Sequence, residues 1–125
     1  MTKRWPRGKP ILCLDFDGTV YSYTSGWTGL NELPDPPTPG AIEFIREALD
    51  SFEVHIYSAR SGQQDGIEAM QEWLERWGGP DMVRMVKWPT SKPPAFVGLD
   101  DRQLTFTGVW PSVEELLAFR PWNHK

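Results

Sequence analysis

The sequence predicts one α/β domain in which helices flank a mostly parallel sheet. Short apolar segments typical of strands alternate along the chain with segments of helical period, as in sheets built from crossover connections. The chain has 125 residues, of which 39% are hydrophobic and 24% are charged. This is enough for one core of that type and too little for two ordinary domains.

The first strand is expected at 11–16, a nearly continuous apolar run within ILCLDFDGTV. Such runs are typical of parallel strands that are covered on both faces. The run ends in Asp15 and Asp17, and Gly18 and Thr19 follow. Two like charges this close repel each other and are costly to bury unpaired, so we expect a cation to compensate them.

A long loop is predicted over 18–38, because this segment is rich in Gly, Ser, Thr and Pro. Loops of this length commonly act as lids or binding segments, and the segment is too short to be a cap domain. Three aromatic residues in it, Tyr21, Tyr23 and Trp27, could form a stacking surface for a sugar or a base.

After the loop, Thr38 as N-cap and Pro39 at the first helical position predict a helix that runs to about 50. The remaining elements are expected in this order: a strand at 53–57, a helix at 63–77, a strand at 82–86, irregular chain at 87–94, a strand at 95–99, a short strand at 104–106, and a last helix opened by the capping box at 112–115 with Val113, Leu116 and Leu117 facing inward.

Polar side chains are expected at the carboxyl ends of three of these strands. Asp15 and Asp17 follow the first strand, Ser58 the second, and Asp100 and Asp101 the fourth. Ligands of open α/β sheets bind at this edge. Clustered carboxylates suit Mg²⁺, whereas two histidines and one cysteine argue against a zinc site.

These residue types can perform phosphoryl transfer. Asp15 could attack phosphorus, and Asp17 could protonate the leaving oxygen and then activate water. Ser58 offers a hydroxyl and Lys92 a positive charge to the phosphate oxygens. Two roles are open for Arg60: it could bind a second anionic group of the substrate, or it could be an ordinary surface residue.

The motifs resemble those of the haloacid dehalogenase (HAD) superfamily of phosphatases. The resemblance rests on DFDGT at 15–19, a serine that ends the next strand, a later lysine, and the Asp-Asp pair at 100–101, and it covers about 10–110. It implies a three-layer Rossmann-like fold of the capless kind. It further implies a phosphatase that depends on Mg²⁺.

By this resemblance Asp15 is the nucleophile and a metal ligand, and Asp17 is the acid/base that lends its backbone carbonyl to the metal. Asp101 binds the metal with Asp100 beside it, and the catalytic lysine is Lys92, with Lys87 as the rival. The phosphate is expected to contact Gly18, Thr19, Ser58, Ala59 and Arg60.

We therefore expect a phosphomonoesterase that forms an aspartyl-phosphate and acts on a nucleotide or a nucleic-acid end, with a sugar phosphate as the alternative. A non-catalytic phosphate-binding or receiver-like module is the other alternative. A receiver takes its phosphoryl group on an aspartate of a middle strand, and here Ser58 and Lys87 stand at those places.

Composition narrows the setting of this activity. The net charge of -4 argues against general nucleic-acid binding. One cysteine, Cys13, excludes an intramolecular disulfide and suits a buried position in a reducing compartment. No apolar run is long enough to span a bilayer, so we expect a cytoplasmic protein without membrane contact. Residues 1–9 are expected to be a loose segment, and the oligomeric state is open.

Overall fold

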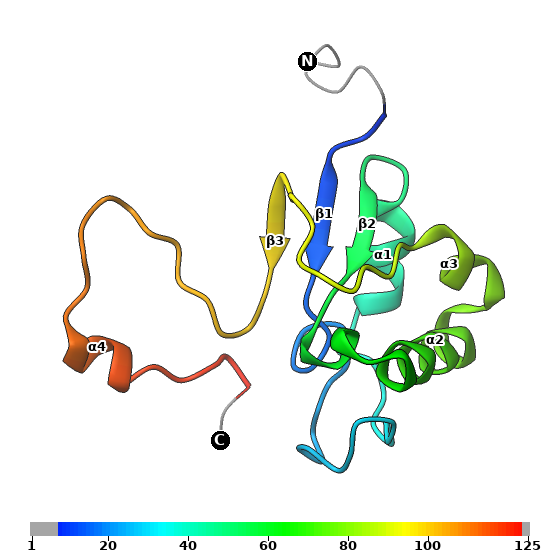
Figure 1. Ribbon diagram of the computed structural model, residues 1–125, viewed down its shortest axis with the longest axis horizontal. Helices are drawn as coiled ribbons and strands as arrows, with labels where there is room; N and C mark the ends of the chain where they lie inside the picture. The colour runs from blue at the N-terminus through cyan, green and yellow to red at the C-terminus, as the bar shows by residue number, and fades with distance from the viewer. Residues whose placement is uncertain (1–7, 124–125) are drawn as a thin grey trace.

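The computed structural model describes residues 8–123. Figure 1 shows the elements in chain order: β1 (Ile11–Leu14), α1 (Ala41–Ala48), β2 (Glu53–Ile56), the 3-10 turn η2 (Ala59–Gly62), α2 (Gln64–Gly78), α3 (Pro80–Met85), β3 (Val97–Leu99) and α4 (Val113–Leu117).

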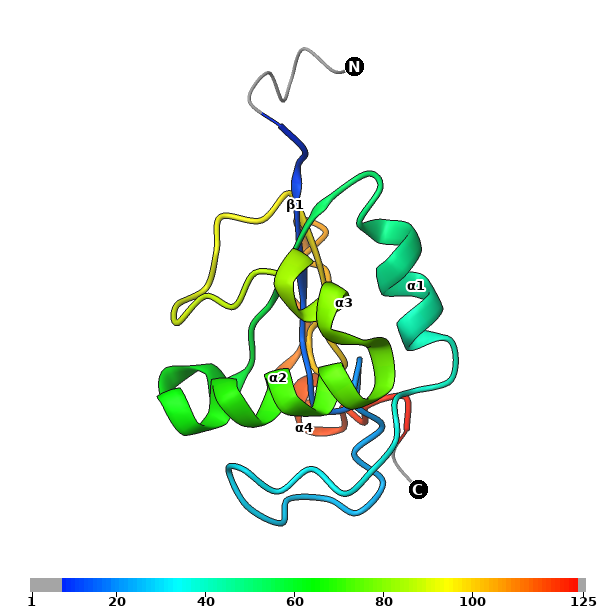
Figure 2. The same cartoon turned by 90° about the vertical axis from the view of Figure 1, so that its right-hand side faces the viewer.

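The three strands form a parallel sheet in the order β2-β1-β3. Leu12 of β1 pairs with Val54 of β2 and with Val97 of β3. Figure 2 looks along the sheet, with α1 on one side and the irregular segment 88–96 on the other. The α/β class, the parallel sheet and its flanking helices are thus confirmed.

The core lies between the sheet and the helices. In β1 and β2 every second residue is buried, as the two-residue period of a strand requires. Trp73 of α2 is fully buried and meets Phe16 and Tyr21 edge-on, at ring-centroid distances of 5.1 Å and 5.5 Å. Trp77, which the helical spacing also assigns to the core, is partly exposed at the end of the same helix.

The predicted strand at 82–86 is wrong, because this segment belongs to α3. Pro80 stands at the first helical position, where its missing N–H costs nothing. Lys87, just after this helix, forms a bridge with β2. Its N–H donates to Val54 O (2.8 Å), and its carbonyl accepts from the Ile56 N–H (3.0 Å). The strand is therefore reduced to a single bridge.

The start of α1 also differs from the prediction. Gly40, not Thr38, is the N-cap, and it adopts a left-handed backbone (φ 86°) without a side-chain cap. The carbonyl of Thr38 accepts from the Ala41 N–H (2.9 Å), and the Thr38 N–H donates to Val20 O (2.9 Å). Thr38 therefore ends the loop and fastens it to Val20.

The C-terminal part departs furthest from expectation. No strand forms at 104–106. The capping box is confirmed, because Ser112 Oγ accepts from the Glu115 N–H and Glu115 bonds back to the Ser112 N–H. However, α4 does not pack inward, and Val113, Leu116 and Leu117 are exposed. We call residues 103–120 the C-terminal arm; Figure 1 shows it extending away from the sheet.

The chain ends are described only in part. Most of the segment 1–9 lies outside the described residues, although Lys9 Nζ does donate to Leu49 O (2.7 Å). In the part of the chain that the structure describes, no helix has the length and apolar character needed to cross a membrane.

Candidate functional site

Three carboxylates meet where β1 and β3 end. The Asp15 N–H donates to Leu99 O (2.9 Å), which continues the strand pairing one residue beyond β1. Asp100 and Asp101 directly follow β3. One carboxylate oxygen of each of these three aspartates lies within 4.8 Å of the others. The structure thus brings together the Asp15, Asp100 and Asp101 side chains that the sequence placed at neighbouring strand ends, and we call them the acidic cluster.

Within the acidic cluster, the ionised form of Asp15 is disfavoured. Burial, the Asp100 charge and a hydrogen bond with Asp101 raise the pKa of Asp15 from 3.8 to about 8. A carboxyl group with this pKa keeps its proton near neutral pH. A cation among these oxygens would stabilise the ionised form, so the cluster has the ligand type and charge of a hard-metal site. Acidic groups also gather at surfaces without an ion.

A cavity of about 430 Å³ opens beside the cluster. Its lining includes Asp15, Asp100, Ser58, Ala59 and Lys92, five of the residues predicted for the site. Lys87 does not line this cavity, and its backbone is paired with β2. The structure therefore favours Lys92 over Lys87 as the lysine of the site.

Sequence reasoning missed the other residues of this cavity, among them Cys13, Tyr57 and Gln103. Cys13 is only half-buried, which corrects the expected core position. Burial raises the pKa of its thiol, and the nearby Lys92 charge lowers it in part. Alternation along β1 could have indicated Cys13, because it lies on the same face as Asp15.

Ser58 has a structural role besides its place in the cavity. Its Oγ accepts from the Arg60 N–H (3.0 Å), and its own N–H donates to Ser61 Oγ (3.0 Å), so it caps η2. The hydroxyl also lies 3.6 Å from Met70 Sδ. These contacts fix the Ser58 hydroxyl at the cavity wall.

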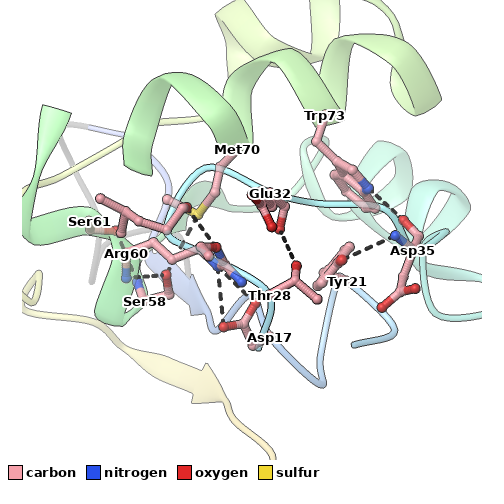
Figure 3. Close-up of polar contacts among 12 residues, drawn as sticks. Asp17, Tyr21, Thr28, Glu32, Asp35, Ser58, Arg60, Ser61, Met70 and Trp73 are labelled. Atoms are coloured by element: carbon pink, nitrogen blue, oxygen red, sulfur yellow. Dashed lines mark hydrogen bonds and ion pairs between the residues drawn. The ribbon is translucent and has the colours of Figure 1, made fainter. Parts of the chain in front are cut away.

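Arg60 is fully buried and does not line the cavity, and its guanidinium points toward Asp17 (Figure 3). Its Nε donates to Asp17 Oδ1 (3.0 Å), and its Nη1 donates to the carbonyls of Gly29 (2.8 Å) and Leu30 (2.7 Å). Trp27 covers the guanidinium, with 4.4 Å from its ring centroid to Cζ. The expected phosphate contact of Arg60 is therefore corrected to a structural one, which joins the long loop to Asp17.

The Asp17 carboxylate points to Arg60 and does not join the acidic cluster. Burial raises the pKa of Asp17, and the Arg60 charge and hydrogen bond lower it only in part. The net effect is a higher pKa, which makes Asp17 a better proton donor near neutral pH.

The backbone N–H groups of Gly18 and Thr19 are already used. Gly18 donates to Tyr21 O (2.8 Å), and Thr19 donates to Phe16 O (3.1 Å). Their backbone N–H groups are thus not available to a phosphate in this arrangement, whereas the buried Thr19 hydroxyl has no hydrogen-bond partner among the described residues. Gly18 matters for another reason: it has φ +80°, and its Cα faces the Asp101 carboxylate.

The predicted aromatic surface of the loop is smaller than expected. Tyr21 is fully buried and stacks on Phe16 at 5.2 Å, so only Tyr23 and the half-exposed Trp27 could meet a ligand. Asp35, which the sequence did not single out, anchors this loop: its carboxylate accepts from the Ser25 N–H (2.7 Å) and Ser25 Oγ (2.6 Å).

Replacing Gly18 by alanine is expected to disturb the acidic cluster. The new Cβ would overlap the Asp101 carboxylate, which would have to move, and the left-handed backbone adds about 1–2 kcal/mol of strain. Gly26→Ala is the matched control, since Gly26 has φ +71° and open space around it. We expect both variants to lose stability and only Gly18→Ala to lose affinity for Mg²⁺ in a calorimetric titration. Equal affinities would contradict this placement of Asp101.

Comparison with known proteins gives little. No family model matches the chain, and no solved structure matches it. A segment of 44 residues, 34% of the chain, is 46% identical to LL-diaminopimelate aminotransferase 2 of Nostoc sp.. The chain spans 11% of the length of that curated relative, and so short a match carries no conclusion about activity.

Proposed function

We propose that this chain is an Mg²⁺-dependent phosphomonoesterase of the capless HAD type, which forms an aspartyl-phosphate on Asp15. The observation that supports the proposal most is the acidic cluster at the carboxyl edge of a parallel sheet, beside a cavity that contains Lys92 and Ser58. A metal ion, a phosphate and an attacking carboxylate would need this set of side chains together.

The donor set fits the proposed metal. Three carboxylates within 4.8 Å of one another offer only hard oxygen ligands, and their mutual repulsion favours a divalent cation. Asp15 and Asp101 would hold the ion, with Asp100 beside them. When bound, Mg²⁺ supplies positive charge that offsets the charges of the carboxylates and of the phosphate oxygens.

The proposed reaction gives each of these side chains one role. An Asp15 oxygen attacks phosphorus as the bond from phosphorus to the leaving oxygen breaks, and the proton of Asp17 passes to that oxygen. Ionised Asp17 then takes a proton from water, which attacks the phosphoryl group and releases phosphate and Asp15. Lys92 and the Ser58 hydroxyl orient the phosphate oxygens from the cavity wall.

For the substrate we propose a nucleotide or a nucleic-acid end. Trp27 leaves 55% of its surface open, and it lies on the loop that Arg60 ties to Asp17. An exposed indole can stack on a base at about 1–3 kcal/mol. A sugar phosphate is the second candidate, because sugars also pack against aromatic rings.

The first test is hydrolysis of p-nitrophenyl phosphate with and without Mg²⁺, followed by nucleotides, 3′- and 5′-phosphorylated oligonucleotides, and sugar phosphates. We expect hydrolysis that depends on the metal, with the nucleotide or oligonucleotide substrates preferred. Preference for sugar phosphates would keep the mechanism and change the substrate. If none of these compounds is hydrolysed, the proposed enzymatic activity is contradicted and the non-catalytic phosphate-binding module is favoured.

The pKa of Asp15 leads to a prediction for stability. Its carboxyl titrates at about 8 in the folded chain against an ordinary 3.8, so the folded state binds the proton more tightly. This group therefore lowers stability as the pH rises between these values. Mg²⁺ should offset the loss, and its effect on Tm should be larger near pH 8 than near pH 5.

Thermal unfolding with and without Mg²⁺ at the two pH values measures this effect. Asp101→Asn removes one proposed ligand and should abolish most of the Mg²⁺ effect on Tm. Asp81→Asn, an exposed carboxylate on α3, is the control and should keep it. An Mg²⁺ effect of equal size at both pH values would contradict the assignment of Asp15 to the metal site.

A further inference from the structure

The C-terminal arm exposes an unusual amount of apolar surface. Seven of its large apolar side chains are between 48% (Leu116) and 82% (Trp110) exposed. They are Leu104, Phe106, Val109, Trp110, Val113, Leu116 and Leu117. Monomeric proteins rarely leave contiguous apolar patches of this kind uncovered, and such patches commonly mark interaction sites.

The two ends of the arm lie close to the same residue of the main body. Before the arm, the Asp101 carboxylate lies so near Gly18 that a side chain there would meet it. At the other end Trp122 Nε1 donates to the carbonyl of the same Gly18 (2.9 Å). The chain between them is therefore a loop closed at its base, and Figure 1 shows that it leaves the sheet and returns.

The arm has a partly organised shape. The rings of Phe106 and Trp110 contact each other, with centroids 4.7 Å apart. Together with Leu104, Val109 and Leu116 they line a hollow of about 600 Å³. The arm thus presents a concave apolar surface that its own described chain does not fill.

The main body has an uncovered surface of the same character. β3 is the edge of the sheet, and its Val97 and Leu99 side chains are 44% and 46% exposed. Leu99 and Phe44 of α1 line a hollow of about 170 Å³ between the helix and the strand, and Phe44 is also 44% exposed. We call Leu99, Phe44 and this hollow the α1–β3 groove.

We propose that the C-terminal arm of one copy packs into the α1–β3 groove of a second copy, and that the exchange is reciprocal. Each chain carries both an unfilled groove and a projecting arm, so one twofold axis covers all four surfaces and closes the assembly. An unrelated partner for the arm would leave the groove uncovered.

The exposed apolar surface of two arms reaches the size of a specific interface. From the exposed fractions and ordinary side-chain areas, one arm offers roughly 600 Å² of apolar surface. Two arms offer roughly 1,200 Å² before the receiving grooves are counted, which exceeds the roughly 1,000 Å² that a specific interface requires.

Light scattering coupled to size-exclusion chromatography tests the assembly. We expect twice the chain mass of 14.3 kDa for the wild type. The arm variant Trp110→Ser/Leu117→Ser and the groove variant Phe44→Ser should shift the mass toward one chain. Met85→Ser, which removes an exposed apolar residue of α3 outside both surfaces, should remain dimeric. A monomeric wild type, or a dimer unaffected by the arm and groove variants, would overturn the proposal.

A disulfide test separates exchange between copies from closure within one chain. In a Cys13→Ser background, Phe44→Cys is combined with Leu117→Cys, and the oxidised protein is analysed without reductant. A covalent product of two chains supports the exchange. A bond within one chain at all protein concentrations would mean that the arm folds onto its own groove, and would overturn the proposal.

Discussion

Asn in place of Asp15 is expected to reduce turnover by about 10⁴-fold or more, because an amide oxygen cannot form the proposed acyl-phosphate. The variant should fold. Burial and the neighbouring carboxylates raise the pKa of Asp15 to about 8, so this position already holds an uncharged side chain near neutral pH, and the isosteric amide should be tolerated there. Loss of activity without loss of Tm would therefore assign the effect to the chemistry.

The companion variant Asp17→Asn should fail at a different step. Without a proton donor, Asp15 can still attack a substrate with a good leaving group, but water is no longer activated for the second step. With p-nitrophenyl phosphate we expect a burst of p-nitrophenolate and an accumulated phosphoenzyme, visible as the mass of one added phosphoryl group. Asp81→Asn should behave as the wild type.

These variants separate the proposed mechanism from its alternatives. Undiminished turnover in Asp15→Asn would rule out Asp15 as the nucleophile. A phosphoryl group found on another residue of Asp17→Asn would do the same. Both measurements are independent of the substrate preference, because they use a small synthetic ester.

The acidic cluster could be predicted from sequence because it depends on topology. Asp15 directly follows β1, and Asp100 directly follows β3. These two strands are adjacent and parallel, so they end at the same edge of the sheet. The lysine could not be assigned in the same way, because Lys87 and Lys92 both belong to the segment that the sequence predicts as irregular. In the structure the backbone of Lys87 pairs with β2, whereas Lys92 lines the cavity.

Local patterns failed where tertiary contacts decide. Residues 82–86 are apolar enough for a strand, but short apolar runs do not distinguish a strand from a buried helix. Here Pro80 begins a helix that packs on α2. In α4 the apolar spacing predicts an inward face, yet this five-residue helix of the arm has no buried residue.

The role of Arg60 could not be predicted, because its partners are far away in sequence. Asp17 lies 43 residues before it, and the carbonyls of Gly29 and Leu30 lie about 30 before it. Nothing in the stretch Ser-Ala-Arg-Ser distinguishes a buried arginine from an exposed one. The guanidinium is nonetheless the only side chain described here that joins the long loop to Asp17.

Arg60→Met is therefore expected to destabilise the fold by about 3 kcal/mol. Methionine keeps much of the apolar stem but leaves Asp17 without its ion pair and two loop carbonyls without their donor. Removing one partner of a buried ion pair costs about 3–5 kcal/mol. The Asp17 side chain is 21% exposed, so water relieves part of its loss and the lower end applies.

Urea unfolding measures this loss, and Arg84→Met is the matched control. Arg84 pairs with Asp81 on α3, but both side chains are largely exposed, and such pairs contribute only about 0–1 kcal/mol. Hydrogen exchange should also accelerate at 28–32 in Arg60→Met alone, because that part of the loop loses its tie to the core. If the two variants lose equal stability, the Arg60 side chain does not hold the long loop against the core, and other contacts, such as those of Asp35 with Ser25, must anchor it.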